Sequence, residues 1–356
     1  MLNKNVDLNG KTILITGAAG FIGANLSRVL LTMFEDIKII GVDNLNDYYD
    51  VSLKEYRLEQ IRQEQKSVSS EFIFQKGSLA DKVFIDQIFT EYQPEVVVNL
   101  AAQAGVRYSI TNPDAYLESN VIGFYNILEA CRHSYDDGRK GVEHLVYASS
   151  SSVYGSNKKI PYSTEDKVDN PVSLYAATKK SNELFAHAYS KLYDIPSTGL
   201  RFFTVYGPAG RPDMAYFGFT DKLVKNETIK IFNYGNCKRD FTYIDDIVKG
   251  IVEVMQRSPL SNEDGVRYKV YNIGNNKPEN LLDFVEILQE ELKAAKVLPE
   301  DYDFEQHKEL VGMQPGDVEV TYADVEELEK DFGFKPSTSL RDGLRKFAQW
   351  YRNYQA

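Results

Sequence analysis

Short apolar segments alternate with amphipathic segments over the first part of the chain. The apolar segments are rich in β-branched residues, as in the buried strands of a parallel sheet, and lie at Thr12–Thr16, Lys38–Asp43, Glu71–Gln75, Glu95–Leu100, His144–Ala148 and Ser197–Phe202. The amphipathic segments have helical spacing and lie at Gly20–Met33, Leu53–Gln65, Asp81–Thr90, Tyr116–Cys131 and Leu174–Tyr193. This alternation of strand and helix predicts an α/β fold with a doubly wound parallel sheet.

The regular alternation weakens after about residue 201, where segments containing Gly, Pro and Asn become frequent. A helix is predicted at Ile244–Met255 and a strand at Tyr268–Ile273, and two further helices are predicted at Phe284–Ala295 and Ser339–Tyr351. The first two of these are expected to return to the large sheet. We therefore predict a nucleotide-binding domain over residues 1–200, also including about 240–275, and a smaller, mainly C-terminal α/β domain over residues 201–356 that binds substrate.

Composition and charge exclude several classes of protein. The chain of 356 residues is 43% hydrophobic and 26% charged, which is typical of a globular protein. Its formal net charge of −11 repels polyanions, so we do not expect nucleic-acid binding. No apolar run is long enough to span a membrane and the start of the chain lacks a secretion signal, so we expect a cytoplasmic protein. The two cysteines and four histidines have no metal-ligand spacing, so neither a disulfide framework nor a metal site is predicted.

A glycine-rich turn follows the first predicted strand. The segment Gly17-Ala-Ala-Gly20-Phe21-Ile22-Gly23 opens a helix, so its glycines can allow a tight turn and a close approach of the backbone to a pyrophosphate. Asp43 ends the next strand, where its carboxylate can accept hydrogen bonds from an adenosine ribose. Asp43 would repel a 2′-phosphate, and its neighbour Asn44 offers no positive charge. The pattern therefore predicts a Rossmann-type site that binds NAD.

A second feature is the pair Tyr175 and Lys179, which lie one helical turn apart on the same face. A free phenol has a pKa of about 10, but a neighbouring ammonium and a positive nicotinamide ring both favour the phenolate. Tyr175 can then act as a base near neutral pH, while Lys179 can also hold the nicotinamide ribose. Such a pair also arises by chance on surface helices, so it needs support from other residues.

That support comes from a run of serines at the end of the predicted strand His144–Ala148. Ser149, Ser150, Ser151 and Ser152 follow this strand, and hydroxyls at the carboxyl end of a parallel strand point into the crevice where such folds bind ligands. They can bond to a sugar hydroxyl as it becomes a ketone. The alternative is a serine-rich turn that satisfies its own backbone.

Together these motifs resemble the extended short-chain dehydrogenase/reductase superfamily. The resemblance rests on the glycine turn, Asp43, Asn99-Leu-Ala-Ala102, the serines followed by Val153-Tyr154-Gly155, and the Tyr-x-x-x-Lys pair, and it spans nearly the whole chain. Within the superfamily the chain is most similar to UDP-glucuronate 4-epimerases, through residues 43–50, 101–108, 201–208, 210–214 and 314–317.

The resemblance implies roles for further residues. It places the catalytic serine on Ser150, beside Tyr175 and Lys179, and it implies that Leu100 and Ala101 contact the cofactor. Arg239 is similar to a diphosphate-binding arginine of the family, and Asp317 is expected to contact the uridine ribose or the sugar. Asp81 either bonds to the edge of the adenine or caps a helix. Homodimers of the family commonly form through the helices that correspond to Tyr116–Cys131 and Leu174–Tyr193, so we expect a homodimer.

The implied reaction inverts carbon 4 of UDP-glucuronic acid, which gives UDP-galacturonic acid through a 4-keto sugar. Similar dehydratases and decarboxylases carry an acidic residue after the catalytic residue, whereas this chain has Ser151 and Ser152, so simple return of the hydride is expected. A 4-keto glucuronate is a β-keto acid, so its carboxylate must be held to prevent loss of carbon dioxide. The candidates are Ser151, Ser152, Thr204 and Arg211, with Arg107 as a second arginine; alternatively, Arg211 braces its own loop or binds a neighbouring acid.

Other activities remain open on the sequence alone. The first is a lyase, either a UDP-glucuronate decarboxylase or a nucleotide-sugar dehydratase. The second is a 4-epimerase of a neutral UDP-hexose. The third is a non-enzymatic NAD sensor on the same fold, against which the intact Tyr175 and Lys179 argue.

Overall fold

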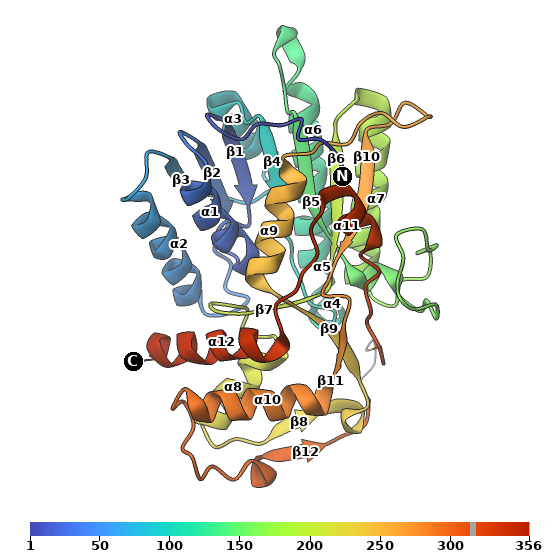
Figure 1. Cartoon of the computed structure of the whole chain (residues 1–356). Helices are drawn as coiled ribbons and strands as arrows, with labels where there is room; N and C mark the ends of the chain where they lie inside the picture. Colours follow the sequence, from blue (N-terminus) through green and yellow to red (C-terminus); the bar gives the residue numbers. More distant parts are fainter. Residues whose placement is uncertain (314–317, 356) are drawn as a thin grey trace.

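The computed structural model describes residues 1–313 and 318–355. Its centre is a parallel seven-stranded sheet in the order β10-β6-β5-β4-β1-β2-β3 (Figure 1). These strands are β1 (Thr12–Thr16), β2 (Lys38–Asp43), β3 (Glu71–Lys76), β4 (Val96–Asn99), β5 (His144–Ser150), β6 (Ser197–Phe202) and β10 (Tyr268–Ile273). The fold class is therefore confirmed, and the predicted strands are found with only small differences at their ends.

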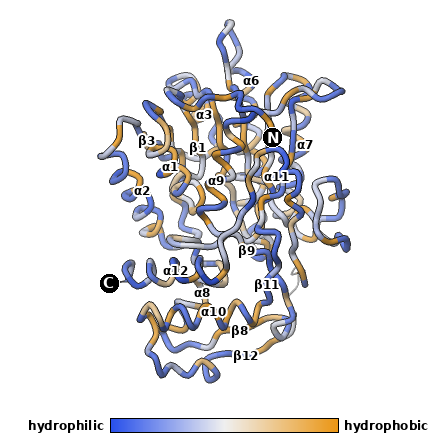
Figure 2. The backbone as a smooth tube through the Cα atoms, viewed as in Figure 1, coloured by the Kyte–Doolittle hydropathy of each residue, from blue (hydrophilic) through white to orange (hydrophobic). Residues whose placement is uncertain are grey.

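Helices cover both faces of this sheet. One face carries α1 (Phe21–Met33), α2 (Val51–Gln65) and α9 (Ile244–Met255); the other carries α3 (Lys82–Tyr92), α6 (Gly123–His133) and α7 (Leu174–Tyr193). Two separate groups of buried apolar side chains fill the space between the sheet and these layers. In Figure 2 the apolar colour follows the central strands, while the projecting loops are largely hydrophilic.

The strand order reverses between β1 and β4. From β1 the chain moves outward through β2 to β3, and it then returns to β4 and continues through β5 and β6 to β10 on the other side. Adjacent strands whose crossovers leave in opposite directions leave a crevice at their carboxyl ends. The glycine turn after β1 and the serine run after β5 both lie at this edge.

A smaller group of elements lies below the carboxyl edge in Figure 1. It contains the sheet β11-β9-β7 and the pair β12-β8, with strands β7 (Thr204–Tyr206), β8 (Ile229–Ile231), β9 (Lys238–Tyr243), β11 (Pro278–Asn280) and β12 (Lys308–Leu310). Its main helices are α8 (Ala215–Val224), α10 (Leu281–Ala294) and α12 (Leu340–Gln355), and α11 (Glu326–Phe332) packs near β10. A division at residue 200 stays a prediction, although β10 does lie in the large sheet.

The helix expected at Tyr116–Cys131 is not uniform, and this prediction was wrong in detail. The structure has two short helices, α4 (Tyr108–Thr111) and α5 (Pro113–Tyr116), followed by a π-helical segment, η1 (Leu117–Ile122), which continues into α6. In η1 the main-chain carbonyl of Asn120 accepts a hydrogen bond from the Asn182 side chain, 2.7 Å away. A wide turn that releases a carbonyl for a side-chain donor is a property of π-helical segments that apolar spacing does not reveal.

Candidate active site

The glycine turn is built so that a backbone–ligand contact is possible. Gly17 has a φ of +69°, and a Cβ there would lie 2.9 Å from the backbone nitrogen of Ala101. A Cβ on Gly23 would lie 2.2 Å from the Gly17 carbonyl oxygen. Helix α1 begins at Phe21 with Gly20 as its N-cap, so the N–H groups of the first turn, including that of Ile22, have no acceptor within the helix. These residues form a cradle that fits the pyrophosphate of a dinucleotide.

Asp43 and Asn44 lie beside this turn and line the same pocket. The Asp43 carboxylate also has a local role: Oδ2 accepts from the backbone N–H of Ala19 at 3.2 Å, and Oδ1 accepts from that of Leu45 at 2.9 Å. Each carboxylate oxygen has a second lone pair, so a ribose hydroxyl can still donate to it. Asp43 therefore also holds the backbone of the glycine turn in place through its bond with Ala19.

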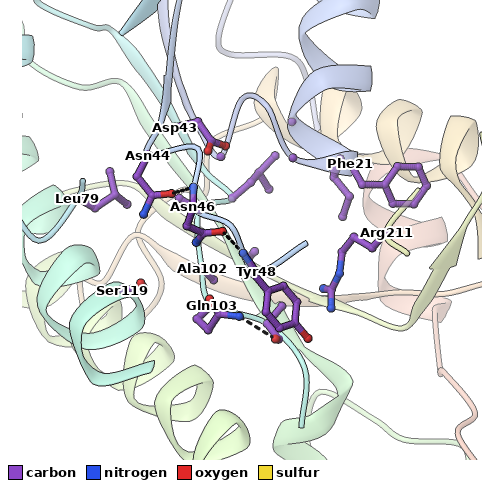
Figure 3. Close-up of a pocket in the computed structure, with 18 of the residues that line it drawn as sticks. Phe21, Asp43, Asn44, Asn46, Tyr48, Leu79, Ala102, Gln103, Ser119 and Arg211 are labelled. Carbon is purple, nitrogen blue, oxygen red and sulfur yellow. Dashed lines mark hydrogen bonds between the residues drawn. The ribbon is translucent and has the colours of Figure 1, made fainter. Parts of the chain in front are cut away.

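The pocket spans the carboxyl ends of β1, β2, β4 and β5. Of the residues predicted to bind cofactor, those that line it are Gly17, Gly20, Phe21, Ile22, Gly23, Asp43, Asn44, Leu100, Ala101, Tyr175 and Lys179. Figure 3 shows the segment from Asp43 to Tyr48 along one wall, with Asn44 and Asn46 each accepting a backbone hydrogen bond from the residue two positions later. One continuous pocket therefore joins the glycine turn to the Tyr-Lys pair.

Tyr175 and Lys179 both face this pocket from α7, and Ser150 faces it from the end of β5. Helix α7 begins just before Tyr175, because the side chain of Ser173 accepts from the backbone N–H of Ala176 and caps the helix. The Lys179 ammonium is buried and donates to the Ala148 carbonyl at 2.9 Å. The cap sets where α7 begins, and the bond from Lys179 holds this helix against the end of β5.

The local environment shifts both pKa values. Burial raises the pKa of Tyr175, while a hydrogen bond with Ser150 and the charge of Arg211 act in the opposite direction. Burial lowers the pKa of Lys179 to about 8. Both shifts disfavour the charged forms, so a phenolate here depends on nearby positive charge, and the charge of Arg211 acts in that direction.

Ser149 and Ser150 both line the pocket, and their hydroxyls bond to different partners. Ser149 donates to the buried carboxylate of Glu183 at 2.6 Å, whereas the Ser150 hydroxyl accepts from the backbone N–H of Ser152 at 3.2 Å. Ser151 and Ser152 begin a short 3₁₀ turn, Ser151–Tyr154, and are not among the residues that line the pocket. Ser151 and Ser152, which follow Ser150, carry hydroxyls and no carboxylate.

Arg211 lies in the pocket and already has an acidic partner. Its Nε and Nη2 donate to the two carboxylate oxygens of Asp213 at 3.0 and 2.5 Å, and the Tyr48 hydroxyl donates to Asp213 at 3.2 Å. In Figure 3 the side chains of Tyr48 and Arg211 point toward the same region. The Nη1 group is not used by Asp213, so the guanidinium keeps donors for a second acceptor.

Of the remaining predicted substrate residues, Thr204, Arg239 and Arg107 do not line this pocket. Thr204 is half-buried at the start of β7, although its neighbours Phe203 and Val205 line the pocket. Arg239 on β9 donates to the carbonyls of Lys238 and Glu319. The guanidinium of Arg107 lies 4.9 Å from the centre of the Phe232 ring. Asp317, with the segment 314–317, lies outside the described residues.

Asp81 was predicted either to bond to the edge of the adenine or to cap a helix, and the structure shows the cap. Its Oδ1 accepts from the backbone N–H of Phe84 at 3.1 Å, so it caps α3. Ser78 and Leu79, just before it, line the pocket instead. The helix cap is therefore the observed role.

Sequence reasoning missed a buried set of amides behind the Tyr-Lys pair. The Asn120 side chain donates to the Gln103 carbonyl and to the Thr178 hydroxyl, both at 3.0 Å, and Asn182 donates to the Asn120 carbonyl. Thr178 lies next to Lys179, so these bonds hold α7 against η1. The available signal was the presence of two asparagines on otherwise apolar helical faces.

Within residues 1–313 and 318–355, no cluster of His, Cys, Asp or Glu side chains could hold a metal ion. In the same described residues, no helix is both long and apolar enough to cross a membrane.

A nucleotide crevice on a doubly wound sheet, with a Ser-Tyr-Lys set at its edge, defines the extended short-chain dehydrogenase/reductase class. Within that class the chain belongs to the GDP-mannose 4,6 dehydratase family, whose model matches residues 14–347.

Individual relatives are also similar over nearly the full chain. The chain is 50% identical to Protein CapI of Staphylococcus aureus over 353 residues, covering 96% of this chain and 98% of that protein. It is 44% identical to UDP-glucuronate 4-epimerase 4 of Arabidopsis thaliana, covering 97% of this chain and 76% of the relative. The solved structure of UDP-glucuronic acid 4-epimerase from Bacillus cereus in complex with UDP-glucuronic acid and NAD is similar with a TM-score of 0.81 at 29% identity, covering 96% of this chain and 99% of that one.

Proposed function

We propose that this protein is an NAD-dependent enzyme that inverts carbon 4 of UDP-glucuronic acid to give UDP-galacturonic acid. The observation that carries the proposal is the single pocket that joins the glycine turn and Asp43 to Ser150, Tyr175 and Lys179. The Arabidopsis relative bears the name of this activity, and the similar Bacillus structure holds both UDP-glucuronic acid and NAD.

The cofactor fits the residues that are present, because the glycine cradle leaves no room for a side chain where a pyrophosphate would approach. The chemistry that NAD supplies when bound is reversible hydride transfer at carbon 4 of the sugar. Tyr175 takes the proton of the 4-hydroxyl and later returns it, and Ser150 bonds to the same oxygen. Lys179 keeps a positive charge beside Tyr175 and favours its phenolate. Inversion requires the 4-keto sugar to turn over within the pocket before the proton returns.

The absence of acidic residues directly after Ser150 supports epimerisation over elimination. A dehydratase or a decarboxylase needs an acid or base for its second step, and Ser151 and Ser152 offer only hydroxyls. We therefore propose that the 4-keto sugar is only reduced again. The lyases remain the second candidate, since the family model that matches the chain is that of a dehydratase.

The test is to incubate the purified protein with UDP-glucuronic acid, without added NAD, and to analyse the products by chromatography and mass spectrometry. UDP-galacturonic acid of unchanged mass is expected, and its formation would also show that NAD is retained through purification. A product lighter by carbon dioxide or by water would contradict the proposal in favour of a lyase. Dinucleotide binding with no reaction of any UDP sugar would favour the NAD sensor.

We expect Arg211→Ala to reduce the preference for UDP-glucuronic acid over UDP-glucose by about tenfold or more, because a charge-assisted hydrogen bond to the sugar carboxylate is lost. The Nη1 group of Arg211 motivates this role, because it donates to no acceptor within the described residues. Asp213→Asn is the matched variant, since it keeps the guanidinium and should keep the preference. The measurement is kcat/KM for the two substrates, and an unchanged ratio in Arg211→Ala would show that Arg211 only binds Asp213.

We also propose a homodimer, because exposed apolar side chains gather on η1, α6 and α7, which contact one another. These are Leu117, Ile122, Tyr125, Leu184 and Leu192, with exposed fractions of 45, 48, 42, 58 and 69%. A second copy of the chain is the occupant that we expect on this surface. Light scattering should give twice the mass of one chain, and Leu184→Glu should give the mass of one chain. A native protein that scatters as a monomer would contradict this expectation.

A further inference from the structure

The guanidinium of Arg57, on α2, is buried although it has no carboxylate beside it in the described part of the chain. Arg57 is 2% exposed, and its hydrogen-bond acceptors are three backbone carbonyls and one hydroxyl. Burial of a charge without a charged partner is costly, and here only hydrogen bonds to neutral acceptors offset that cost. The position therefore points to a task that depends on the donors of an arginine.

The four hydrogen bonds of Arg57 reach three different loops. Nη1 donates to the carbonyl of Ala19 in the glycine turn at 3.1 Å and to the hydroxyl of Tyr49 at 2.6 Å. Nε donates to the carbonyl of Ala209 at 2.8 Å, and Nη2 donates to that of Gly210 at 2.8 Å. Because the guanidinium is planar and rigid, these bonds fix the glycine turn relative to the loop that follows β7.

The loop on the far side of Arg57 carries Arg211 directly after the two bonded carbonyls. Ala209 has a φ of +53°, which a residue with a side chain rarely adopts. A Cβ on Gly210 would lie 1.6 Å from the hydroxyl of Tyr216, so this backbone approaches the core closely. The strained turn is held in place by its bonds to Arg57, and its position determines where Arg211 enters the pocket.

We propose that Arg57 is a positioning residue that couples the dinucleotide site to the loop that bears Arg211. The identity of the two ligands rests on the proposed function, but the coupling itself does not depend on which UDP sugar is converted. A ligand that orders one loop then strengthens binding at the other, and this coupling is reciprocal. A bound nucleotide sugar should therefore slow the release of NAD, and Arg57 should be needed for that effect.

The experiment measures the rate of NAD release from the purified holoenzyme, alone and with saturating UDP-glucuronic acid or UDP-glucose. In the native protein, at least one nucleotide sugar should slow release by about tenfold. In Arg57→Met, release should be faster and the ratio of the two rates should approach one. Arg57→Lys keeps the charge but lacks the planar fork, so its ratio should be intermediate. Arg62→Met is the control, because Arg62 is exposed on the same helix and pairs only with Glu59 in the described residues.

Several outcomes would overturn the coupling. It is wrong if Arg57→Met keeps the native ratio, whatever its melting temperature, because a purely structural role would lower stability alone. It is also wrong if neither nucleotide sugar slows NAD release from the native protein. If Arg57→Met does not fold, Arg57→Lys and Tyr49→Phe decide, and unchanged ratios in both would overturn it. A native protein that shows the coupling but forms no UDP-galacturonic acid would contradict the proposed function and leave the role of Arg57 intact.

Discussion

Tyr175→Phe is expected to lower kcat by about three orders of magnitude, which corresponds to roughly 4 kcal/mol of transition-state free energy. The substitution removes the hydroxyl that exchanges the proton but keeps the aromatic ring, whose centre lies 6.0 Å from the centre of the Tyr116 ring. Binding of NAD and of the nucleotide sugar should therefore change little. The measurement is kcat together with the NAD content and the KM, and only kcat should fall.

Two further variants make the result specific. Tyr189→Phe removes a hydroxyl from the same helix, where it donates to Glu129 far from the pocket, and it should leave kcat near the native value. Lys179→Met should move the rising limb of the pH profile of kcat to higher pH, because burial raises the pKa of Tyr175 and the neighbouring charge that favours phenolate is lost. If Tyr175→Phe kept a tenth of the native kcat, Tyr175 could not be the base.

Most of the fold could be predicted because buried parallel strands and amphipathic helices leave strong patterns. The segments Thr12–Thr16, Lys38–Asp43 and Leu174–Tyr193 match the observed elements at both ends. The π-helical form of Leu117–Ile122 could not be predicted from the sequence. A π-helical turn changes which residues face the core without changing their apolar character. In this segment the Asn120 carbonyl accepts a hydrogen bond from the side chain of Asn182, which is distant in the sequence.

The candidate site was predictable where one short motif builds it, and not where several distant loops meet. The glycine turn and the Tyr175–Lys179 pair depend on local spacing, so the sequence located both. No local motif pointed to Arg57, because its side chain bonds to loops that lie far from it in the sequence. The pairing of Arg211 with a neighbouring acid was among the alternatives, and the structure shows that Arg211 bonds to Asp213 while it also lines the pocket.

The second large effect is expected beneath the serine run, where Glu183 and Arg201 form a buried ion pair. Both are almost fully buried, and Arg201 donates through Nε and Nη2 to the two carboxylate oxygens at 2.8 and 2.9 Å. Although burial raises the pKa of Glu183, the bonds and charge of Arg201 lower it overall. Arg201 also donates to the hydroxyl of Tyr154, and Ser149 donates to Glu183, so the pair supports the segment that carries Ser150.

Arg201→Met should therefore reduce the free energy of unfolding by about 3–5 kcal/mol, because it leaves the Glu183 carboxylate buried without its main partner. The double variant Arg201→Met/Glu183→Met should lose less, since no unpaired charge remains. Lys180→Met is the control: Lys180 contacts the same carboxylate at 3.3 Å from a more exposed position, so its loss should cost less than about 1 kcal/mol. Urea unfolding at one pH gives all three values.

The pH dependence of the single variant provides an independent check on this argument. Without Arg201, burial should raise the pKa of Glu183 in the folded state above its unfolded value. A carboxyl group with a raised folded pKa favours folding when it is protonated, so its contribution is present below the unfolded pKa and is lost as the pH rises through the folded pKa. The deficit of Arg201→Met relative to the native protein should therefore be larger at pH 8 than at pH 5. A deficit that is independent of pH, or a double variant less stable than Arg201→Met, would show that the cost comes from lost packing and not from the unpaired carboxylate.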